Sequence, residues 1–298
     1  MTEEIPTVGP WARDKLDRLQ KYLSAYTRIM AKQPWAQGYV YVDAFAGPGR
    51  ARVRPIRSDD PTYDIFESGE DLRKDEEARQ VLDGSPRMAL QIEHPFTHYV
   101  FLERDPERAE ILKRIQHEYK DRRNIVVGSG DCNNYLNDKL INNPQINWKK
   151  WRGVVFLDPF GMQVPWVTIA GLAKTRAIEV FLNFPVGMSI QRLLRRDGKF
   201  TDKQLRKLND YFGDPGWFEI VYTKSIGLFG ASQSKAGDAE QRLVKWYRER
   251  LGNAFGYVSD AYLIKNSHGG HLYFLIFAGP NQAGAKIAND ILRSGARI

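Results

Sequence analysis

Apolar residues gather in short runs along the chain, and each run ends in a turn of small or polar residues. Bulky β-branched and aromatic side chains dominate these runs, which is the pattern of strands buried in a sheet. The runs predict strands over residues 39–42, 97–102, 124–127, 153–157, 178–185, 256–264 and 272–277. The last two flank a short turn at 266–270, so they must pair antiparallel.

Helical periodicity marks the first long segment, residues 11–30. Its apolar positions recur every three or four residues: Leu16, Leu19, Leu23, Tyr26 and Met30. Its charged residues fall largely off that stripe: Arg13, Asp14, Asp17, Arg18 and Lys21. For Lys15 we expect a solvated side chain, and contact with a ligand pocket is the alternative.

Three further helices have recognisable starts. Ser85 suits an N-cap and Pro86 the first position of a helix that continues to Ile92. Asp105-Pro106 begins another helix, and a third covers residues 238–251. The region between 186 and 256 otherwise reads as helices and loops.

The first strand ends in Asp43, and the turn Ala44-Phe45-Ala46-Gly47-Pro48-Gly49 follows it. Gly47 and Gly49 carry no Cβ, so the backbone can turn sharply there and approach a ligand closely. A nucleotide-binding strand–loop–helix unit begins in this way. A purely structural turn is the alternative, because buried strands often end in glycine.

Polar residues also stand at the ends of the next strands. Glu103 follows the second strand and is placed to accept hydrogen bonds from both hydroxyls of a ribose. Asp131 and Cys132 follow the third strand. We expect Asp131 to meet an adenine amino group, with a helix-capping aspartate as the alternative.

The fourth strand ends in Asp158-Pro159-Phe160-Gly161. The Asp158 carboxylate and the Pro159 carbonyl are adjacent acceptors, which suits the orientation of an exocyclic amine. Phe160 is a candidate for stacking on an extruded base, and burial in the core is its alternative. Asn183, at the end of the fifth strand, either assists this site or shapes a turn.

These alternations predict an α/β fold in one domain, 1–298, with insertions at about 50–83 and 186–256. The sheet is expected to be a seven-stranded, mostly parallel Rossmann-like sheet with an antiparallel last strand. This is the plan of class I S-adenosylmethionine-dependent methyltransferases. Dinucleotide oxidoreductases share the first two signals but lack the Asp-Pro and the final hairpin.

The charge favours an acidic partner, with nucleic acid the commonest. The 298 residues carry a net charge of +8 and a pI near 9.4. A basic cluster lies in the second insertion: Arg192, Arg195, Arg196, Lys199, Lys203, Arg206 and Lys207. Another lies after the glycine turn: Arg50, Arg52, Arg54 and Arg57. Solvated charged faces without a partner are the alternative.

Cysteine content and apolar length limit the other classes. The single cysteine, Cys132, excludes a disulfide framework and a cysteine-based zinc cluster, and no metal site is expected. A buried apolar role suits Cys132 better than nucleophilic chemistry. No apolar run reaches the length of a membrane span, and the N-terminus lacks a secretory signal. We expect a cytoplasmic protein.

Several segments resemble those of the three-Cys-motif partner proteins, the TcmP family. They are Tyr41 to Gly49, Gly84-Ser85-Pro86, Phe156 to Gly161, Leu182 to Pro185 and Leu272 to Phe277, in the same order. The resemblance implies a methyltransferase-like fold and a three-cysteine partner protein similar to radical S-adenosylmethionine enzymes. The string Asp158 to Gly161 is also similar to that of tRNA guanosine dimethyltransferases. Adenine and cytosine aminomethyltransferases place an aromatic residue where Gly161 stands.

Two functions remain open from the sequence. The first is a methyltransferase acting on an exocyclic amine of a base in RNA or DNA. In it, Asp43, Gly47 and Gly49 hold the methionine part of S-adenosylmethionine, Glu103 the ribose and Asp131 the adenine, and Phe45 and Cys132 complete the cofactor site. Arg50, Asn183, Arg195 and Arg196 contact the substrate. The second is a nucleic-acid-binding partner protein that performs no transfer. Methylation of a small molecule is a third possible function.

Overall fold

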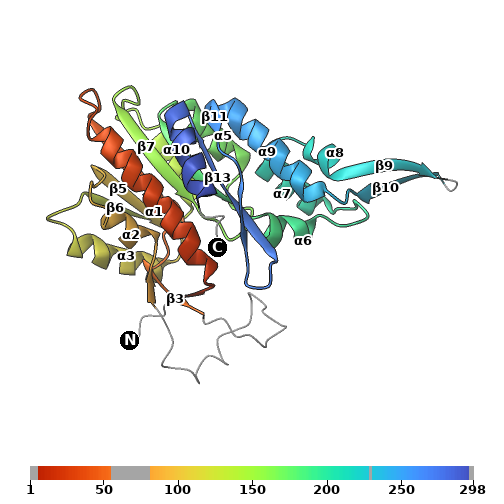
Figure 1. The fold of residues 1–298 in the computed structure, drawn as a ribbon, viewed down its shortest axis with the longest axis horizontal. Coiled ribbons are helices and arrows are strands. Elements are labelled where there is room, and N and C mark those ends of the chain that lie inside the picture. Colours follow the sequence, from red (N-terminus) through yellow and green to blue (C-terminus); the bar gives the residue numbers. More distant parts are fainter. Residues whose placement is uncertain (1–5, 55–80, 228–229, 295–298) are drawn as a thin grey trace, which may run out of the picture.

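A computed structural model describes residues 6–54, 81–227 and 230–294 of the chain (Figure 1). Arg57 and the acidic run between Glu67 and Glu77 lie outside the described residues. Among the residues that are described, no helix is both long and apolar enough to cross a bilayer.

One large sheet organises the molecule. Its strands are β2 (Gly38–Asp43), β5 (His98–Glu103), β6 (Ile125–Ser129), β7 (Trp151–Leu157), β8 (Ile178–Phe184), β11 (Tyr257–Val258), β12 (Tyr262–Lys265) and β13 (His271–Gly279). Their order is β11-β13-β8-β7-β2-β5-β6, with β12 also paired to β13. The strands from β6 to β8 are parallel, and β13 is antiparallel to β8. This is the strand order of the class I methyltransferase sheet, and the predicted fold class is confirmed.

The last hairpin departs from the prediction in one detail. Residues 256–264 were expected to form one strand, but they form β11 and β12, separated by Ser259 to Ala261. The sheet therefore has eight strands rather than seven. Ser259 is buried at the break, where its Oγ accepts a hydrogen bond from the backbone N–H of Phe277. The hydroxyl replaces a strand partner at the point where the chain leaves the ladder.

Helices cover both faces of the sheet. The helices are α1 (Trp11–Met30), α2 (Ser85–Leu90), α3 (Pro106–Glu118), α4 (Cys132–Tyr135), α5 (Trp166–Lys174), α6 (Gln191–Leu193), α7 (Asp202–Phe212), α8 (Trp217–Val221), α9 (Ala239–Phe255) and α10 (Gln282–Arg293), with π-helical turns η3 (Leu136–Ile141) and η4 (Val186–Ile190). Side chains alternate across β2, so that Tyr41 joins the core under α1, α2, α3 and α10, while Val42 joins the core under α5, α7 and α9.

Helix starts follow the local sequence closely, with one correction. Asp105 caps α3 through hydrogen bonds from the backbone N–H groups of Glu107 and Arg108, as its position before Pro106 indicated. The predicted N-cap Ser85 is wrong: the N-cap is Gly84, and Ser85 is the first residue of α2. The Ser85 hydroxyl instead bonds Asp43. Helix α10 was not predicted, although its buried residues Ala285, Ala288 and Leu292 recur at helical spacing.

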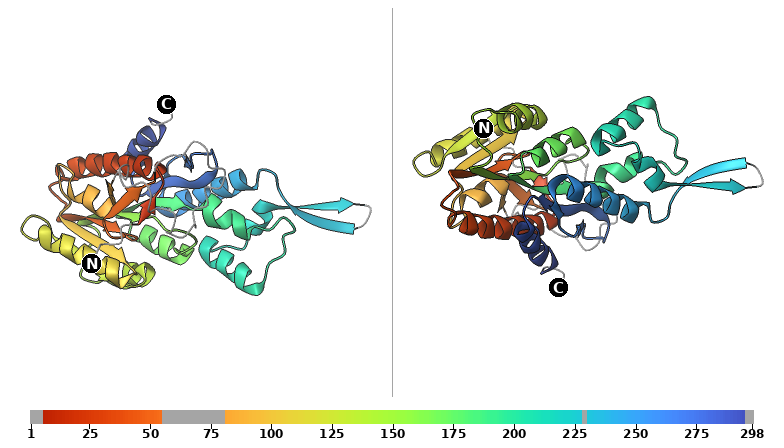
Figure 2. Two further views of the ribbon diagram at one scale, coloured as in Figure 1. Left: turned by 90° about the horizontal axis from the view of Figure 1, so that it is seen from below. Right: turned by 90° about the horizontal axis from the view of Figure 1, so that it is seen from above.

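The insertions add smaller elements to this frame. Strands β3 (Arg50–Val53) and β4 (Val81–Asp83) pair with each other, and β1 (Thr7–Val8) pairs with β3. In the second insertion, β9 (Tyr222–Gly227) and β10 (Gly230–Lys235) form a two-stranded antiparallel ribbon, where only helices and loops were expected. The ribbon extends away from the body of the molecule in all three views (Figures 1 and 2).

Helix α1 carries a buried charge that its apolar stripe did not reveal. Arg18 falls off the stripe, but it is only 3% exposed. Its guanidinium pairs with Asp14 and donates to the carbonyl oxygens of Ile291 and Leu292, at 2.7 and 2.9 Å. Those carbonyls belong to the last turn of α10, which lies beside α1 (Figure 1). Arg18 therefore caps α10 and fixes the two helices together.

A second buried polar contact joins α1 to the sheet. The Tyr22 hydroxyl donates a 2.6 Å hydrogen bond to Glu179 on β8. Burial raises the pKa of Glu179 to about 7, although the Tyr22 bond acts in the opposite direction. The folded protein thus holds a proton on this carboxyl at a pH where the unfolded chain has released it.

We expect the stability contributed by Glu179 to fall as the pH rises from about 4.5 to about 7. Glu179→Gln removes this titration and keeps an acceptor for Tyr22. Between pH 5 and pH 8, the wild type should lose about 2–3 kcal/mol of unfolding free energy relative to the variant. Urea denaturation at the two pH values measures the difference. A difference that does not change with pH contradicts the prediction.

Candidate functional site at the carboxyl edge of the sheet

The carboxyl ends of the parallel strands meet at one edge of the sheet, and backbone hydrogen bonds join the loops that leave them. The Ala44 N–H donates to the carbonyl of Phe156 at the end of β7, at 3.1 Å. The Ala46 N–H donates to Leu102 at the end of β5, at 3.0 Å, and Gly130 after β6 donates to Glu103, at 3.1 Å. The predicted tips of the first four strands are therefore neighbours.

The two glycines of the first turn have different surroundings. Both have positive φ, +59° at Gly47 and +76° at Gly49, which explains why glycine is needed. A Cβ on Gly49 would lie 2.6 Å from Cδ1 of Ile115, so Gly49 allows the turn to pack against α3. A Cβ on Gly47 would meet nothing within 4 Å. Gly47 is therefore the glycine that borders open space.

Asp43 holds the turn from inside. Its carboxylate is fully buried and accepts hydrogen bonds from the Phe45 N–H and the Tyr41 hydroxyl, both at 3.3 Å, and from Ser85. Burial raises the pKa of Asp43 to about 7, with the Ser85 and Phe45 bonds opposing that shift. Because all of these donors belong to the protein, Asp43 shapes the loop from beneath rather than presenting its carboxylate at the open side.

The next two acids also form bonds within their own loops. Glu103 accepts from the Asp105 N–H through Oε1, at 2.9 Å. Asp131 caps α4 by accepting from the Asn133 and Asn134 N–H groups, and both bonds use Oδ1. The helix-cap alternative for Asp131 is thus realised. The second oxygen of each carboxylate takes no part in these bonds.

Cys132 lies under this edge and not on it. Its thiol packs in the core with Leu102 and Leu136, and burial raises its pKa to about 12. A thiol with this pKa stays protonated at neutral pH, which confirms the expected buried role. Only the backbone of Cys132 remains available to a ligand.

A charged cluster surrounds the end of β7. Lys15 of α1 forms an ion pair with Oδ2 of Asp158, and Asn183 Nδ2 donates to Oδ1 of the same carboxylate at 2.7 Å. The Lys15 ammonium lies over the Tyr273 ring, 5.4 Å from its centroid. The expectation of a solvated Lys15 is wrong, because the residue is only 8% exposed. The predicted neighbours Asp158 and Asn183 are in direct contact.

The electrostatics of this cluster explain how a lysine is kept there. Burial works against the charge on Lys15, but attraction to Asp158 outweighs it, so the pKa of Lys15 is raised. Burial also raises the pKa of Tyr273 to about 12, which keeps its hydroxyl protonated. Because the Asp158 carboxylate accepts from Nδ2 of Asn183, the amide oxygen points the other way. That oxygen is buried without a hydrogen-bond partner in the described part of the chain.

Phe160 stands out from the surface. Its side chain is 77% exposed, so the alternative of a core phenylalanine is wrong. Pro159 beside it is buried. An aromatic ring held in solvent next to Asp158 offers a face for stacking.

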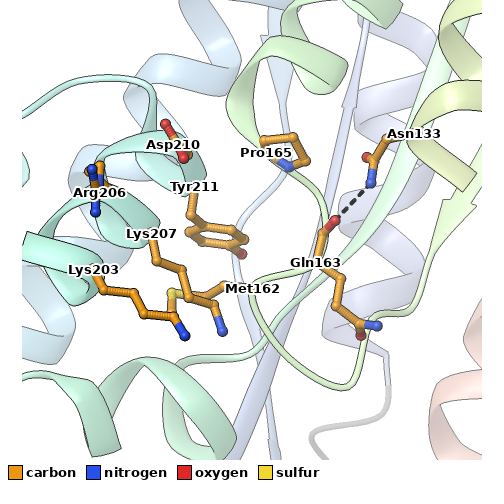
Figure 3. A pocket seen from close by; sticks show the side chains of 9 residues that line it. All are labelled: Asn133, Met162, Gln163, Pro165, Lys203, Arg206, Lys207, Asp210 and Tyr211. Atoms are coloured by element: carbon orange, nitrogen blue, oxygen red, sulfur yellow. Dashed lines mark hydrogen bonds between the residues drawn. The ribbon is translucent and has the colours of Figure 1, made fainter. Parts of the chain in front are cut away.

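A pocket of about 470 Å³ opens beside this edge (Figure 3). Its lining residues are Asn133, Met162, Gln163, Pro165, Lys203, Arg206, Lys207, Asp210 and Tyr211. Asn133 follows the Asp131 cap, and its Nδ2 donates to the Gln163 carbonyl at 2.9 Å. The pocket therefore lies between helix α4, the loop after β7 and helix α7.

The other predicted substrate residues lie elsewhere. Arg50 begins β3 and pairs with Asp83 at 3.5 Å. Arg195 pairs with Asp197 at 3.3 Å, and neither Arg195 nor Arg196 lines the pocket. Within the same basic cluster, the three residues on α7 are the ones that face it. The described residues hold no group of three or more potential metal ligands.

The residues at this edge fit S-adenosylmethionine. Gly47 and Gly130 each have positive φ and open space where a Cβ would stand, and they flank the Glu103 loop from either side. Glu103 and Asp131 each keep one carboxylate oxygen outside their loop bonds. A cofactor bound here would meet its ribose and adenine partners along one continuous edge.

Comparisons with known proteins show only a distant structural similarity. No protein-family model matches this chain, and no curated protein matches its sequence. The protein LPL1258 of Legionella pneumophila is 14% identical, with a TM-score of 0.39 over 87% of this chain and 96% of its own. TYW2 of M. jannaschii, solved with AdoMet, is 11% identical, with a TM-score of 0.30 over 86% of this chain and 74% of its own. The fold assignment rests on the strand order and not on these likenesses.

We expect Lys15→Met to destabilise the fold by about 3 kcal/mol, because it leaves the Asp158 charge without its partner. The double variant Lys15→Met, Asp158→Asn removes both charges and should recover part of that loss. Chemical denaturation of both single variants, Lys15→Met and Asp158→Asn, of the double variant and of the wild type measures the effect. A double variant that loses the full sum of the single effects shows that the ion pair contributes no coupling.

Proposed function

We propose that this protein is an S-adenosylmethionine-dependent methyltransferase that acts on an exocyclic amine of a base in nucleic acid. The observation that carries the proposal is the single edge on which Gly47, Glu103, Asp131 and Asp158 follow four parallel strands. The resemblance of several segments to the TcmP family favours the same assignment, and on that resemblance we propose that the protein acts together with a three-cysteine partner protein. The net charge of +8 supports a nucleic-acid substrate.

Residues at this edge are proposed to contact different parts of the cofactor. Gly47 gives the methionine part of the cofactor room against the turn, and Asp43 keeps that turn in shape. Glu103 and Asp131 offer carboxylate oxygens to the ribose and adenine. The cofactor supplies an electrophilic methyl group, and the protein aligns the acceptor nitrogen with it. Such alignment alone can lower a barrier by roughly 7–11 kcal/mol.

Asp158 and the Pro159 carbonyl are proposed to orient the amine. Each carboxylate oxygen has two lone pairs, so Asp158 can accept from an amine while it stays bonded to Lys15 and Asn183. Phe160, exposed beside it, is placed to stack on the base that carries the amine. The ion pair with Lys15 holds the carboxylate in one orientation.

The same ion pair favours a second candidate function. A carboxylate already bonded to an ammonium and an amide is a weaker acceptor for a substrate amine. This suits a non-catalytic, nucleic-acid-binding partner protein that keeps the fold without the transfer. Cofactor binding separates the two candidates, because the second requires none.

We expect S-adenosylmethionine to bind, and Gly47→Ala to weaken it at least tenfold, because the new methyl group enters the open space over the turn. Gly256→Ala is the matched control, since Gly256 also has positive φ and open surroundings but caps α9 away from this edge. Isothermal titration measures both. Absence of heat with wild-type protein at millimolar cofactor favours the partner-protein function.

We expect Asp158→Asn to abolish methyl transfer to nucleic acid while cofactor affinity stays within a few-fold of the wild type. The substitution keeps the shape of the side chain but removes the charge that faces the amine. Transfer of a labelled methyl group to total RNA and to genomic DNA is the readout. If the variant loses cofactor binding as well, Asp158 supports the cofactor site and does not orient the acceptor.

A further inference from the structure

Helix α7 presents three cationic side chains to the pocket at the edge of the sheet. Lys203, Arg206 and Lys207 are spaced three and four residues apart, so they share one face of the helix (Figure 3). Asn133 and the loop from Met162 to Pro165 form the opposite wall. At about 470 Å³, the pocket has the size of a ligand site.

The charges in this pocket are not neutralised by the protein. None of the three cations forms an ion pair within the ranges that the structure describes, and Asp210 is the only acid among the lining residues. Three like charges on adjacent turns repel one another, which costs stability unless an anion joins them. The pocket is therefore prepared for a negatively charged group.

A buried hydroxyl in the pocket points to the same kind of ligand. Tyr211 is only 2% exposed, and its Oη has no hydrogen-bond partner among the described residues. Buried tyrosine hydroxyls normally find a partner, because an unmade hydrogen bond in the protein interior is destabilising. Burial also raises the pKa of Tyr211 well above its ordinary value, so the hydroxyl is a donor at neutral pH. A donor of this kind suits an anionic oxygen.

The pocket lies next to the groups proposed to bind the acceptor base. Met162 follows Asp158-Pro159-Phe160-Gly161 directly, and Asn133 is two residues beyond Asp131. A base stacked on Phe160 would thus have its backbone near α7. Phosphate is the group that follows every base at a fixed distance along a strand, and arginine binds it through its planar fork.

We propose that this pocket binds the phosphodiester backbone of a single-stranded nucleic acid beside the base held at Asp158 and Phe160. The inference rests on the proposed function for the location of that base. It narrows the sequence expectation, which covered the whole basic cluster, to Lys203, Arg206 and Lys207, and it assigns no backbone contact to Arg195 and Arg196.

The test compares two triple variants with the same loss of charge. The pocket variant removes the three cations of the pocket by the substitutions Lys203→Ala, Arg206→Ala and Lys207→Ala. The control variant carries Lys120→Ala, Arg122→Ala and Lys149→Ala. These three exposed cations precede β6 and β7, at the opposite edge of the sheet. Fluorescence anisotropy with labelled single-stranded RNA and DNA oligonucleotides of mixed sequence, over a range of salt concentrations, gives affinity and salt slope.

A plot of log affinity against log salt has a negative slope. We expect this slope to be less steep by about 2 in the pocket variant, since each phosphate that the protein no longer neutralises reduces its steepness by about 0.7. The control variant should change it by much less. Tyr211→Phe should weaken binding about tenfold with an unchanged slope, because it removes one hydrogen bond to a charged group and no charge. RNA and DNA arms show which sugar the site accepts, and a slope change with either supports the proposal.

Equal decreases of slope in the two triple variants overturn the proposal, because they show a general effect of net charge. Wild-type protein that binds inorganic phosphate but neither oligonucleotide also overturns it, in favour of a small phosphorylated ligand. The assay contains no cofactor and measures no transfer. Failure of methyl transfer is therefore distinguishable from failure of the backbone site.

Discussion

The pairing of β2 with both of its neighbours fixes the position of every group at the candidate site. Val42 lies opposite Val100 of β5 and Val155 of β7, and the register holds to the end of the strand. Buried backbone amides must remain hydrogen-bonded, so this strand cannot slide between its partners. A shift of one residue would also turn its apolar side chains to the wrong face. The turn at Gly47 thus reaches the edge where Glu103 and Asp158 follow their own strands.

Local patterns in the sequence were sufficient for this frame. Buried strands and the polar residue at each tip could be read because every signal lies within about ten residues, the length of a strand and its turn. The partners of buried charged residues could not be predicted from the sequence. Lys15 and Asp158 are 143 residues apart, and Arg18 meets α10 across 273 residues. Periodicity assigns a charged residue to solvent unless its distant partner is already known.

The elements that escaped prediction differ in their patterns. The ribbon of β9 and β10 extends from the body of the molecule (Figure 2), and both strands consist largely of small and polar residues without a regular apolar alternation. Helix α10 escaped prediction although its buried residues Ala285, Ala288 and Leu292 recur at helical spacing. The sequence predicts a basic cluster of seven residues but not the cationic pocket. It does not show which of these residues share a face of α7.

The bonds from Arg18 to the last turn of α10 set an order on the biogenesis of this protein. A chain emerging from the ribosome exposes α1 first, with a guanidinium whose acceptors do not yet exist outside the exit tunnel. The apolar side of α1 also remains uncovered where α10 will lie. The contact between α1 and α10 can therefore form only after residues 291 and 292 have left the exit tunnel, and only then can this face of the sheet close.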